Sequence, residues 1–243
     1  MRIGFWSIVL AVALAGCGGD AAQDPAAENT VQAPEDVPEE TAVTGPERRV
    51  LAFGDSLFAG YNVAQGESYP ARLEAALRAR GVNASVTNAG VSGDTTAAGR
   101  QRLSFVLDNE AAAPDLAIVE LGGNDLLRGI APAQTRENLA AILDTLRQRD
   151  IPVLLMGMRA PPNLGAQFVD EFDAIYPALA GEYGARLVPF FLEAVYSRPE
   201  LIQQDRIHPT ADGIEALVEA TVGRVAEALP ERSERPDSDG EKD

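Results

Sequence analysis

Residues 50–57 read Val50-Leu51-Ala52-Phe53-Gly54-Asp55-Ser56-Leu57, an apolar run that ends in a turn and a serine. A short apolar run bounded by turn residues is typical of a strand that is covered on both faces, as in parallel sheets. Glycine and aspartate after such a run are, by themselves, ordinary turn residues. The stretch therefore predicts a buried first strand with a hydroxyl group just beyond its carboxyl end.

Further apolar runs alternate with segments of helical period along the rest of the core. The expected strands are 50–53, 84–86, 116–121, 153–156 and 186–190. Apolar residues three and four positions apart predict helices over 72–80, 139–146, 168–179 and 214–225. This alternation predicts an α/β fold in which helices cover both faces of one parallel sheet, giving three αβα layers.

The two ends of the 243-residue chain differ in composition from the core. Residues 1–17 combine a basic start with an apolar stretch too short to span a bilayer, which predicts a secretory signal. Residues 18–47 carry eight acids and no basic residue, which predicts a flexible acidic tether. Residues 231–243 predict a similar acidic tail, so we expect one folded domain over 48–230.

The last four residues of the expected signal, Leu14-Ala15-Gly16-Cys17, resemble the lipobox of bacterial lipoproteins. In those proteins the cysteine is lipidated and becomes the new N-terminus. The resemblance implies an exported protein that is anchored through Cys17 on the periplasmic side of the cell envelope, with Gly18 favouring the outer membrane. An ordinary signal peptide that contains a cysteine is the alternative. Cys17 is also the only cysteine, so no disulfide can form within one chain.

The net charge of −17 at pH 7 limits the range of partners. The 48–230 core carries 23 acids against 16 arginines, and such an acidic core argues against a nucleic-acid partner. One histidine and one cysteine leave no zinc site, and no phosphate-binding Gly-x-x-x-x-Gly-Lys sequence is present. We therefore expect no metal and no cofactor, with carboxylate-bound metals open as an alternative.

Polar motifs follow three of the expected strands. They are Gly54-Asp55-Ser56, residues 88–94 and Gly122-Gly123-Asn124-Asp125. Ligands of such folds bind at the carboxyl ends of the strands, so these motifs should share one edge of the sheet. Asp205-Arg206-Ile207-His208 follows much later and holds the only imidazole, which takes and returns protons near neutral pH. Each motif alone is a weak signal, but together they indicate a split hydrolase site.

The four blocks resemble those of the SGNH (GDSL) hydrolase family. The matching residues are Ser56, Gly90, Asn124 within Gly-x-Asn-Asp, and Asp205-x-x-His208. Residues 119–125, 175–177 and 188–191 also resemble the bacterial multifunctional thioesterases of that family, which include acyl-CoA thioesterase, protease, lysophospholipase and arylesterase activities. The resemblance implies a flavodoxin-like sheet of five parallel strands. We further expect a monomer.

The expected catalytic residues are Ser56, Asp205 and His208. A serine hydroxyl is a poor nucleophile until a base removes its proton, which is the role expected of His208. Asp205 would hold the other ring nitrogen and stabilise the imidazolium. Asp55 and Asp125 stand beside the motifs, but we expect them to bond backbone amides of the strand-end loops instead.

The family resemblance also implies an oxyanion hole. Its donors would be the backbone N–H groups of Ser56 and Gly90 and the side-chain amide of Asn124. Glycine suits position 90 because it lets the backbone approach a ligand closely.

The loop after residues 153–156 is the expected substrate-binding element. By the same resemblance, Met158, Ala160 and Pro161 would contact the acyl chain, and methionine offers adaptable apolar surface. The related thioesterases carry a leucine where this chain has Ala160. Their chain-length preference is therefore not carried over.

The sequence thus predicts a serine hydrolase of esters and thioesters that works through an acyl-enzyme. Expected substrates are aryl and short- to medium-chain acyl esters, acyl-CoA and lysophospholipids. A carbohydrate O-deacetylase of the envelope is one alternative, although the thioesterase-like stretches speak against it. A non-catalytic envelope lipoprotein is another, although all five site residues are retained. No Gly-x-Ser-x-Gly elbow is present, which disfavours the α/β-hydrolase family.

Overall fold

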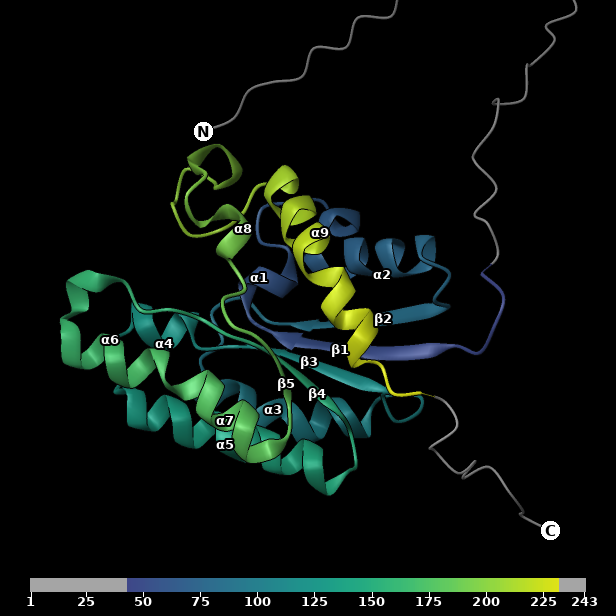
Figure 1. Cartoon of the computed structure of the whole chain (residues 1–243), viewed down its shortest axis with the longest axis horizontal. Coiled ribbons are helices and arrows are strands. Elements are labelled where there is room, and N and C mark those ends of the chain that lie inside the picture. Colours follow the sequence, from purple (N-terminus) through teal and green to yellow (C-terminus); the bar gives the residue numbers. More distant parts are fainter. Residues whose placement is uncertain (1–42, 232–243) are drawn as a thin grey trace, which may run out of the picture. The chain divides into compact units, whose positions relative to one another are not determined.

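The computed structural model describes residues 43–231, which contain one sheet of five parallel strands (Figure 1). The strands are β1 (Arg48–Gly54), β2 (Ala84–Gly90), β3 (Leu116–Glu120), β4 (Val153–Met156) and β5 (Arg186–Val188). Their order in the sheet is β2-β1-β3-β4-β5, with every neighbouring pair parallel. This is the flavodoxin-like order, so the fold prediction is confirmed. The expected signal segment with Cys17, the tether up to residue 42 and the tail from residue 232 lie outside the described residues.

Helices cover both faces of the sheet and make the three expected layers (Figure 1). One face carries α2 (Tyr69–Ala79) and α9 (Ala211–Ala228), and the other carries α3 (Thr96–Asp108), α5 (Pro132–Gln148) and α7 (Ile175–Tyr183). Shorter helices fill the connections: α1 (Ser56–Ala59), α4 (Gly123–Leu127), α6 (Ala166–Asp173) and α8 (Glu193–Tyr196). Three 3-10 turns complete the described chain: η1 (Gln65–Glu67), η2 (Pro162–Leu164) and η3 (Pro199–Leu201).

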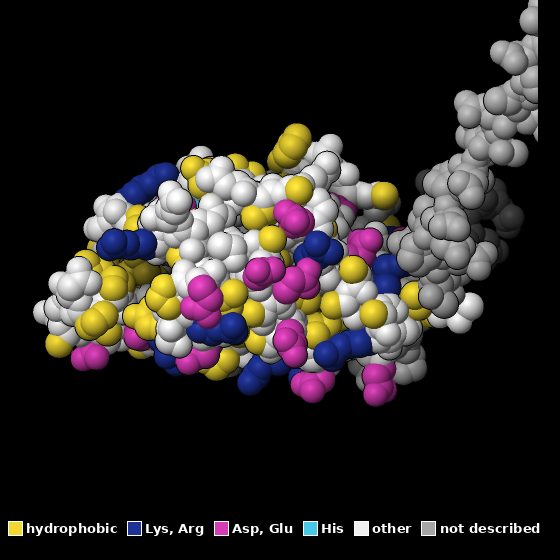
Figure 2. All heavy atoms as spheres, turned by 90° about the horizontal axis from the view of Figure 1, so that it is seen from above, with side chains coloured by type: hydrophobic (Ala, Val, Ile, Leu, Met, Phe, Trp, Pro, Cys, Tyr) yellow, Lys and Arg dark blue, Asp and Glu magenta, His cyan; other side chains and the backbone are white. Residues whose placement is uncertain are grey.

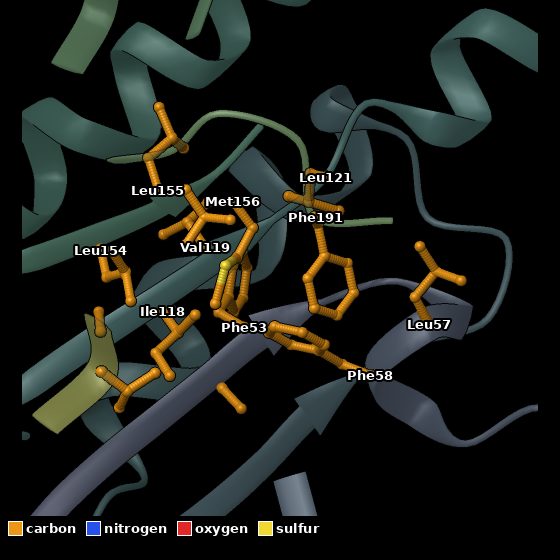
Figure 3. Close-up of a cluster of buried hydrophobic side chains, with 14 of the residues drawn as sticks. Phe53, Leu57, Phe58, Ile118, Val119, Leu121, Leu154, Leu155, Met156 and Phe191 are labelled. Carbon is orange, nitrogen blue, oxygen red and sulfur yellow. The ribbon is translucent and has the colours of Figure 1, made fainter. Parts of the chain in front are cut away.

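The core lies along the central strands and continues under α1. Figure 3 shows Phe53, Phe58 and Phe191 converging with apolar side chains of β3 and β4. The Phe58 ring of α1 stacks on Tyr69 with 5.0 Å between centroids and meets the edge of Phe191 at 5.7 Å. The buried Tyr69 hydroxyl is paired with Thr221 Oγ1 at 2.7 Å. Burying an aromatic side chain of this kind stabilises the folded state by roughly 1.5–3 kcal/mol. The packing of Phe58 therefore holds α1 against the core directly after Ser56.

The short helices α1, α4 and α8 were not predicted, β2 extends to Gly90, and two longer helical regions also differ from the sequence prediction. Helix α3 was not predicted, because small residues such as Thr96 and Gly99 occupy part of its buried face and weaken the apolar period. Its start is marked by Thr95, whose side chain accepts a hydrogen bond from the Ala98 backbone N–H. The single helix predicted over 168–179 is instead two helices, α6 and α7, separated at Ala174.

The surface is charged and mixed. Acidic and basic side chains are interspersed on the face seen in Figure 2. Exposed ion pairs such as Arg136–Glu182, at 2.7 Å, join neighbouring helices, and each contributes about 0–1 kcal/mol. Within residues 43–231, no helix has the length and apolar character needed to cross a membrane.

Candidate active site

Ser56 stands at the point where β1 gives way to α1. Asp55 caps this short helix, with its Oδ1 accepting a hydrogen bond from the Leu57 backbone N–H at 3.0 Å. The cap fixes the turn after the strand, and the buried Phe58 ring holds the next turn in the core. Only 9% of Ser56 is exposed, so its hydroxyl lies at the carboxyl edge of the sheet but is largely shielded from water.

A chain of hydrogen bonds joins Ser56 to the late motif. His208 Nε2 lies 2.8 Å from Ser56 Oγ, and His208 Nδ1 lies 2.6 Å from Asp205 Oδ2. The other carboxylate oxygen, Asp205 Oδ1, accepts the backbone N–H groups of Ile207 at 2.9 Å and His208 at 3.0 Å. The structure therefore brings together, in series, a hydroxyl and an imidazole that are 152 residues apart in sequence.

The loop that carries the imidazole is fastened at several points. Gln203 donates its backbone N–H to the His208 carbonyl at 2.7 Å. The Gln203 side-chain amide donates to the carbonyls of Tyr61 at 2.9 Å and Pro209 at 2.8 Å. The Tyr61 ring also lies over the imidazole, with 4.4 Å between ring centroids. These contacts tie the histidine loop to the segment after α1, so the base is held in register with the serine.

Asp205 has the electrostatic properties of an ionised partner for the imidazole. Slight burial acts to raise the Asp205 pKa, but hydrogen bonds from His208 and the Ile207 backbone N–H outweigh it. The pKa of Asp205 consequently lies below its ordinary value. A carboxylate that stays charged at neutral pH can accept Nδ1–H and leave Nε2 free to take a proton from Ser56.

Asn124 presents its amide on α4 beside the serine. Its Nδ2 donates one hydrogen bond to Asp55 Oδ2 at 2.9 Å, and an amide nitrogen carries two hydrogens. The second hydrogen is available for a substrate oxygen. The adjoining Asp125 is fully buried and accepts hydrogen bonds from the Thr96 backbone N–H at 2.8 Å and from Thr135 Oγ1 at 3.1 Å. Asp125 thus fastens the loop, as the sequence predicts.

Gly90 lies where the sequence places it but makes a bond that the sequence does not suggest. A Cβ at this position would collide with the Ala59 backbone nitrogen, so only glycine fits against α1. The Gly90 N–H donates to Asn88 Oδ1 at 2.9 Å, and Asn88 Nδ2 donates to the Phe58 carbonyl at 3.0 Å. To act as an oxyanion donor, Gly90 must share or exchange its bond to Asn88.

The three residues expected to contact substrate lie in different surroundings. Met158 is buried, and its Cε would be 3.4 Å from a Cβ placed on Gly123, so it borders the segment that leads into Asn124. Ala160 is also buried, and its backbone N–H donates to Asp173 Oδ1 on α6 at 2.8 Å. Pro161 is exposed. Of the three, Met158 is therefore the one that lies beside Gly123, the residue next to Asn124.

Sequence reasoning did not single out Glu120, Asn88 or Tyr61. Glu120 is wholly buried at the end of β3, with its Oε2 3.4 Å from the Asp55 backbone nitrogen. The sequence could have indicated Glu120, because acidic residues are rarely buried without a partner and this one lies inside the apolar run 116–121. Asn88 opens the polar block 88–94, but its bond to the Phe58 carbonyl depends on the folding of a distant segment, as do the contacts of Tyr61 with Gln203 and His208.

A parallel α/β sheet that carries a hydroxyl, an imidazole and a carboxylate in series at its carboxyl edge is the arrangement of an acyl hydrolase. Comparison with known proteins gives the family. The sequence profile described as "GDSL-like Lipase/Acylhydrolase family" matches residues 52–216. The chain belongs to this family and is a hydrolase.

Individual relatives agree with this assignment. The chain is 40% identical over 169 residues to the arylesterase of Vibrio mimicus, covering 70% of this chain and 84% of the relative. It is 42% identical over 163 residues to thioesterase 1/protease 1/lysophospholipase L1 of Escherichia coli strain K12, covering 67% and 76%. The crystal structure of AlinE4, an SGNH-hydrolase family esterase, is 66% identical with a TM-score of 0.66 and covers 77% of this chain and 100% of AlinE4.

Proposed function

We propose that the protein hydrolyses carboxylic esters and thioesters with Ser56 as nucleophile, His208 as general base and acid, and Asp205 as the orienting carboxylate. The observation that carries this proposal is the continuous pair of contacts from Ser56 Oγ to His208 Nε2, at 2.8 Å, and from His208 Nδ1 to Asp205 Oδ2, at 2.6 Å. Both distances are within the range needed for proton transfer.

In the acylation step, Ser56 Oγ attacks the acyl carbonyl carbon while its proton passes to His208 Nε2. Asp205 stabilises the resulting imidazolium through Nδ1–H. The carbonyl oxygen becomes an oxyanion, for which the Ser56 backbone N–H, the free amide hydrogen of Asn124 and the Gly90 N–H are the proposed donors. The carbon–oxygen or carbon–sulfur bond then breaks, and His208 returns the proton to the leaving alcohol or thiol.

Deacylation repeats the sequence with water. His208 Nε2 takes a proton from the water as it attacks the acyl-enzyme carbonyl, and the same donors hold the second oxyanion. When the bond to Ser56 Oγ breaks, the proton returns from the imidazolium to the serine. The products are a carboxylic acid and the restored enzyme.

We infer the substrate classes from the relatives and from Met158. One relative is named an arylesterase and another a thioesterase and lysophospholipase, and both descriptions imply an activated or single-chain acyl group. The unbranched Met158 side chain beside Gly123 offers an adaptable apolar surface for such a chain. Aryl esters, short- to medium-chain acyl esters, acyl-CoA and lysophospholipids are the proposed substrates.

The test is a series of p-nitrophenyl esters of increasing chain length, followed by acyl-CoA and lysophospholipid, with the full chain and its Ser56→Ala variant. We expect Ser56→Ala to lose at least about 1,000-fold in kcat, because the nucleophile is removed. Ser104→Ala, an exposed serine on α3, is the matched control and should keep full activity. Activity that survives loss of Ser56 contradicts the proposal, and release of acetate from glycan without action on longer esters would favour an O-deacetylase.

We further propose that the protein is exported and anchored in the envelope through lipidated Cys17. The support is the sequence alone, with its basic start, short apolar stretch and small residues before the cysteine. Fractionation of cells that produce the wild type and Cys17→Ala tests this. The wild type should sediment with membranes and the variant should not. A variant that stays in the membrane fraction contradicts the anchor.

A further inference from the structure

Two buried carboxyl side chains, those of Asp55 and Glu120, lie side by side, and Asp55 Oδ1 is 3.5 Å from Ser56 Oγ. Asp55 is 2% exposed and Glu120 is 0% exposed. Gly54 pairs with Glu120 in the sheet register, and a Cβ on Gly54 would come within 2.9 Å of Glu120 Oε2. Glycine at this position therefore leaves the space that the Glu120 carboxyl group occupies.

Two adjacent buried carboxylates cannot both keep a negative charge cheaply. Burial and the negative charge of Asp55 raise the pKa of Glu120 well above its ordinary value. Burial raises the pKa of Asp55 as well, but hydrogen bonds from Leu57 and Asn124 oppose that shift. The proton of the pair accordingly resides on Glu120, and Asp55 keeps the charge.

The hydrogen bonds of the pair agree with this distribution. Glu120 Oε1 is one of two buried side-chain nitrogen or oxygen atoms that lack a hydrogen-bond partner in residues 43–231. An unpartnered oxygen costs less on a neutral acid than on a carboxylate. Asp55, in contrast, accepts the Leu57 backbone N–H at 3.0 Å and the Asn124 amide at 2.9 Å, as a charged group should.

Asp55 therefore links the turn that presents the serine to the amide proposed for the oxyanion hole. Its Oδ1 caps α1 and lies 3.5 Å from Ser56 Oγ, while its Oδ2 holds Asn124 Nδ2. A rotation of the Asp55 carboxylate would move the amide hydrogen away from the developing oxyanion. The Glu120 side chain hydrogen-bonds with the Asp55 side chain, and Glu120 Oε2 also accepts the Asp55 backbone N–H at 3.4 Å, so Glu120 is placed to hold that carboxylate.

We propose that Glu120 is a positioning residue: as a neutral carboxylic acid it donates a hydrogen bond to Asp55, which holds the Asn124 amide in line with the oxyanion. This inference rests on the proposed function, because it assigns Asn124 to transition-state binding. The need is for a donor at position 120, not for a charge. Glutamine supplies such a donor, and leucine does not.

Steady-state kinetics on a p-nitrophenyl ester test the requirement for a donor. Glu120→Leu should lower kcat about 10- to 100-fold with KM unchanged, because a displaced amide affects the transition state more than the ground state. Glu120→Gln should restore kcat to within a few-fold of the wild type. Glu74→Gln is the matched control, because Glu74 Oε2 accepts the Val86 backbone N–H at 2.7 Å on α2, away from the site. A Gln variant as impaired as the Leu variant would overturn the proposal.

Infrared spectroscopy gives a second readout that needs no activity. At neutral pH, exposed carboxyl groups are ionised, so the C=O stretching band of a protonated acid should be visible in the wild type and absent from Glu120→Gln. Glu74→Gln should keep the band. A wild-type spectrum without it would overturn the proposal, even if the Leu variant fails to fold. If Ser56→Ala stays active, the proposed function fails, whereas the band still decides the protonation of Glu120.

Discussion

Two carboxyl groups flank Ser56 in opposite environments. The Asp205 side chain is 34% exposed and meets an imidazole, and the pKa of Asp205 lies below its ordinary value. Glu120 is fully buried against Asp55, and its pKa lies well above the ordinary value. In the proposed mechanism each acts through another group, Asp205 through His208 and Glu120 through Asp55. The comparison teaches that burial and neighbouring charge, not residue type, decide whether an acid serves as a charge or as a proton donor.

The largest effect on kcat is expected from replacing Asp205, the more exposed of the two carboxyl groups. Asp205→Asn replaces the charge by a neutral amide that no longer fixes the imidazole tautomer, so kcat on a p-nitrophenyl ester should fall on the order of 1,000-fold. Asp212→Asn, an exposed acid in the first turn of α9, is the matched control and should have no such effect. Asp205→Asn activity within tenfold of the wild type would mean that the ring is oriented by other groups.

The next largest effect on kcat is expected at Asn124, whose amide Glu120 is proposed to position through Asp55. Asn124→Ala removes one proposed oxyanion donor and should lower kcat about 100-fold or more. The melting temperature should change little, because Asn124 is only partly buried and Asp125 retains its own bonds to Thr96 and Thr135. The paired measurements are kcat and thermal unfolding. A fall in kcat that tracks a fall in stability would point to a structural role.

The pH dependence of the free energy of unfolding tests whether the Glu120 pKa is raised. Its pKa is raised in the folded state above about 4.3 in the unfolded chain, so the folded state binds the extra proton. That stabilisation is complete below the unfolded pKa and is lost as pH rises through the folded pKa. Between those values, wild-type stability relative to Glu120→Gln should fall as pH rises, by at most about 1.4 kcal/mol per pH unit, which urea unfolding at successive pH values above about 4.3 measures.

The groups around Glu120 that could contribute to this slope are Asp55 and, on α7, Tyr176. Both remain in the variant, but removing the Glu120 carboxyl group also removes its effect on the Asp55 pKa, so the difference between the two proteins reports on the coupled pair. A difference that is flat across this pH range would show that Glu120 titrates normally.

The smallest effect should be the opposite slope at Asp205. Its pKa is depressed in the folded state, so its stabilisation is present above the unfolded pKa of about 3.9 and is lost as pH falls through the folded value. Asp205→Asn should be less stable than the wild type at neutral pH, and the two should converge in acid. Urea unfolding at pH 7 and pH 3 measures this. A deficit that grows in acid would contradict the assigned direction.

The sequence predicts the sheet well because each strand carries its own local signal. Residues 50–53 are apolar on both faces, and such a run needs no knowledge of its neighbours. The four polar blocks could be placed at one edge because parallel strands all end there. Helix α3 escaped prediction because its buried face is made partly of small residues, whose burial depends on what packs against them.

The contacts of the residues that surround the proposed triad could not be predicted from the sequence, for a similar reason. The bond from Asn88 to the Phe58 carbonyl and the pairing of Glu120 with Asp55 are set by side-chain directions and by the approach of other elements. Spacing along the chain carries no information about either. The proposed triad, in contrast, could be suggested from the sequence, because only one imidazole was available to meet the serine.

Labelling with a fluorophosphonate probe tests the central claim most directly, because such a probe reacts with a serine only when a base activates it. Intact-mass measurement and peptide mapping should find one adduct per chain, on Ser56, and His208→Ala should be labelled far more slowly. An adduct on another residue, or equal labelling rates for the wild type and His208→Ala, would contradict the account.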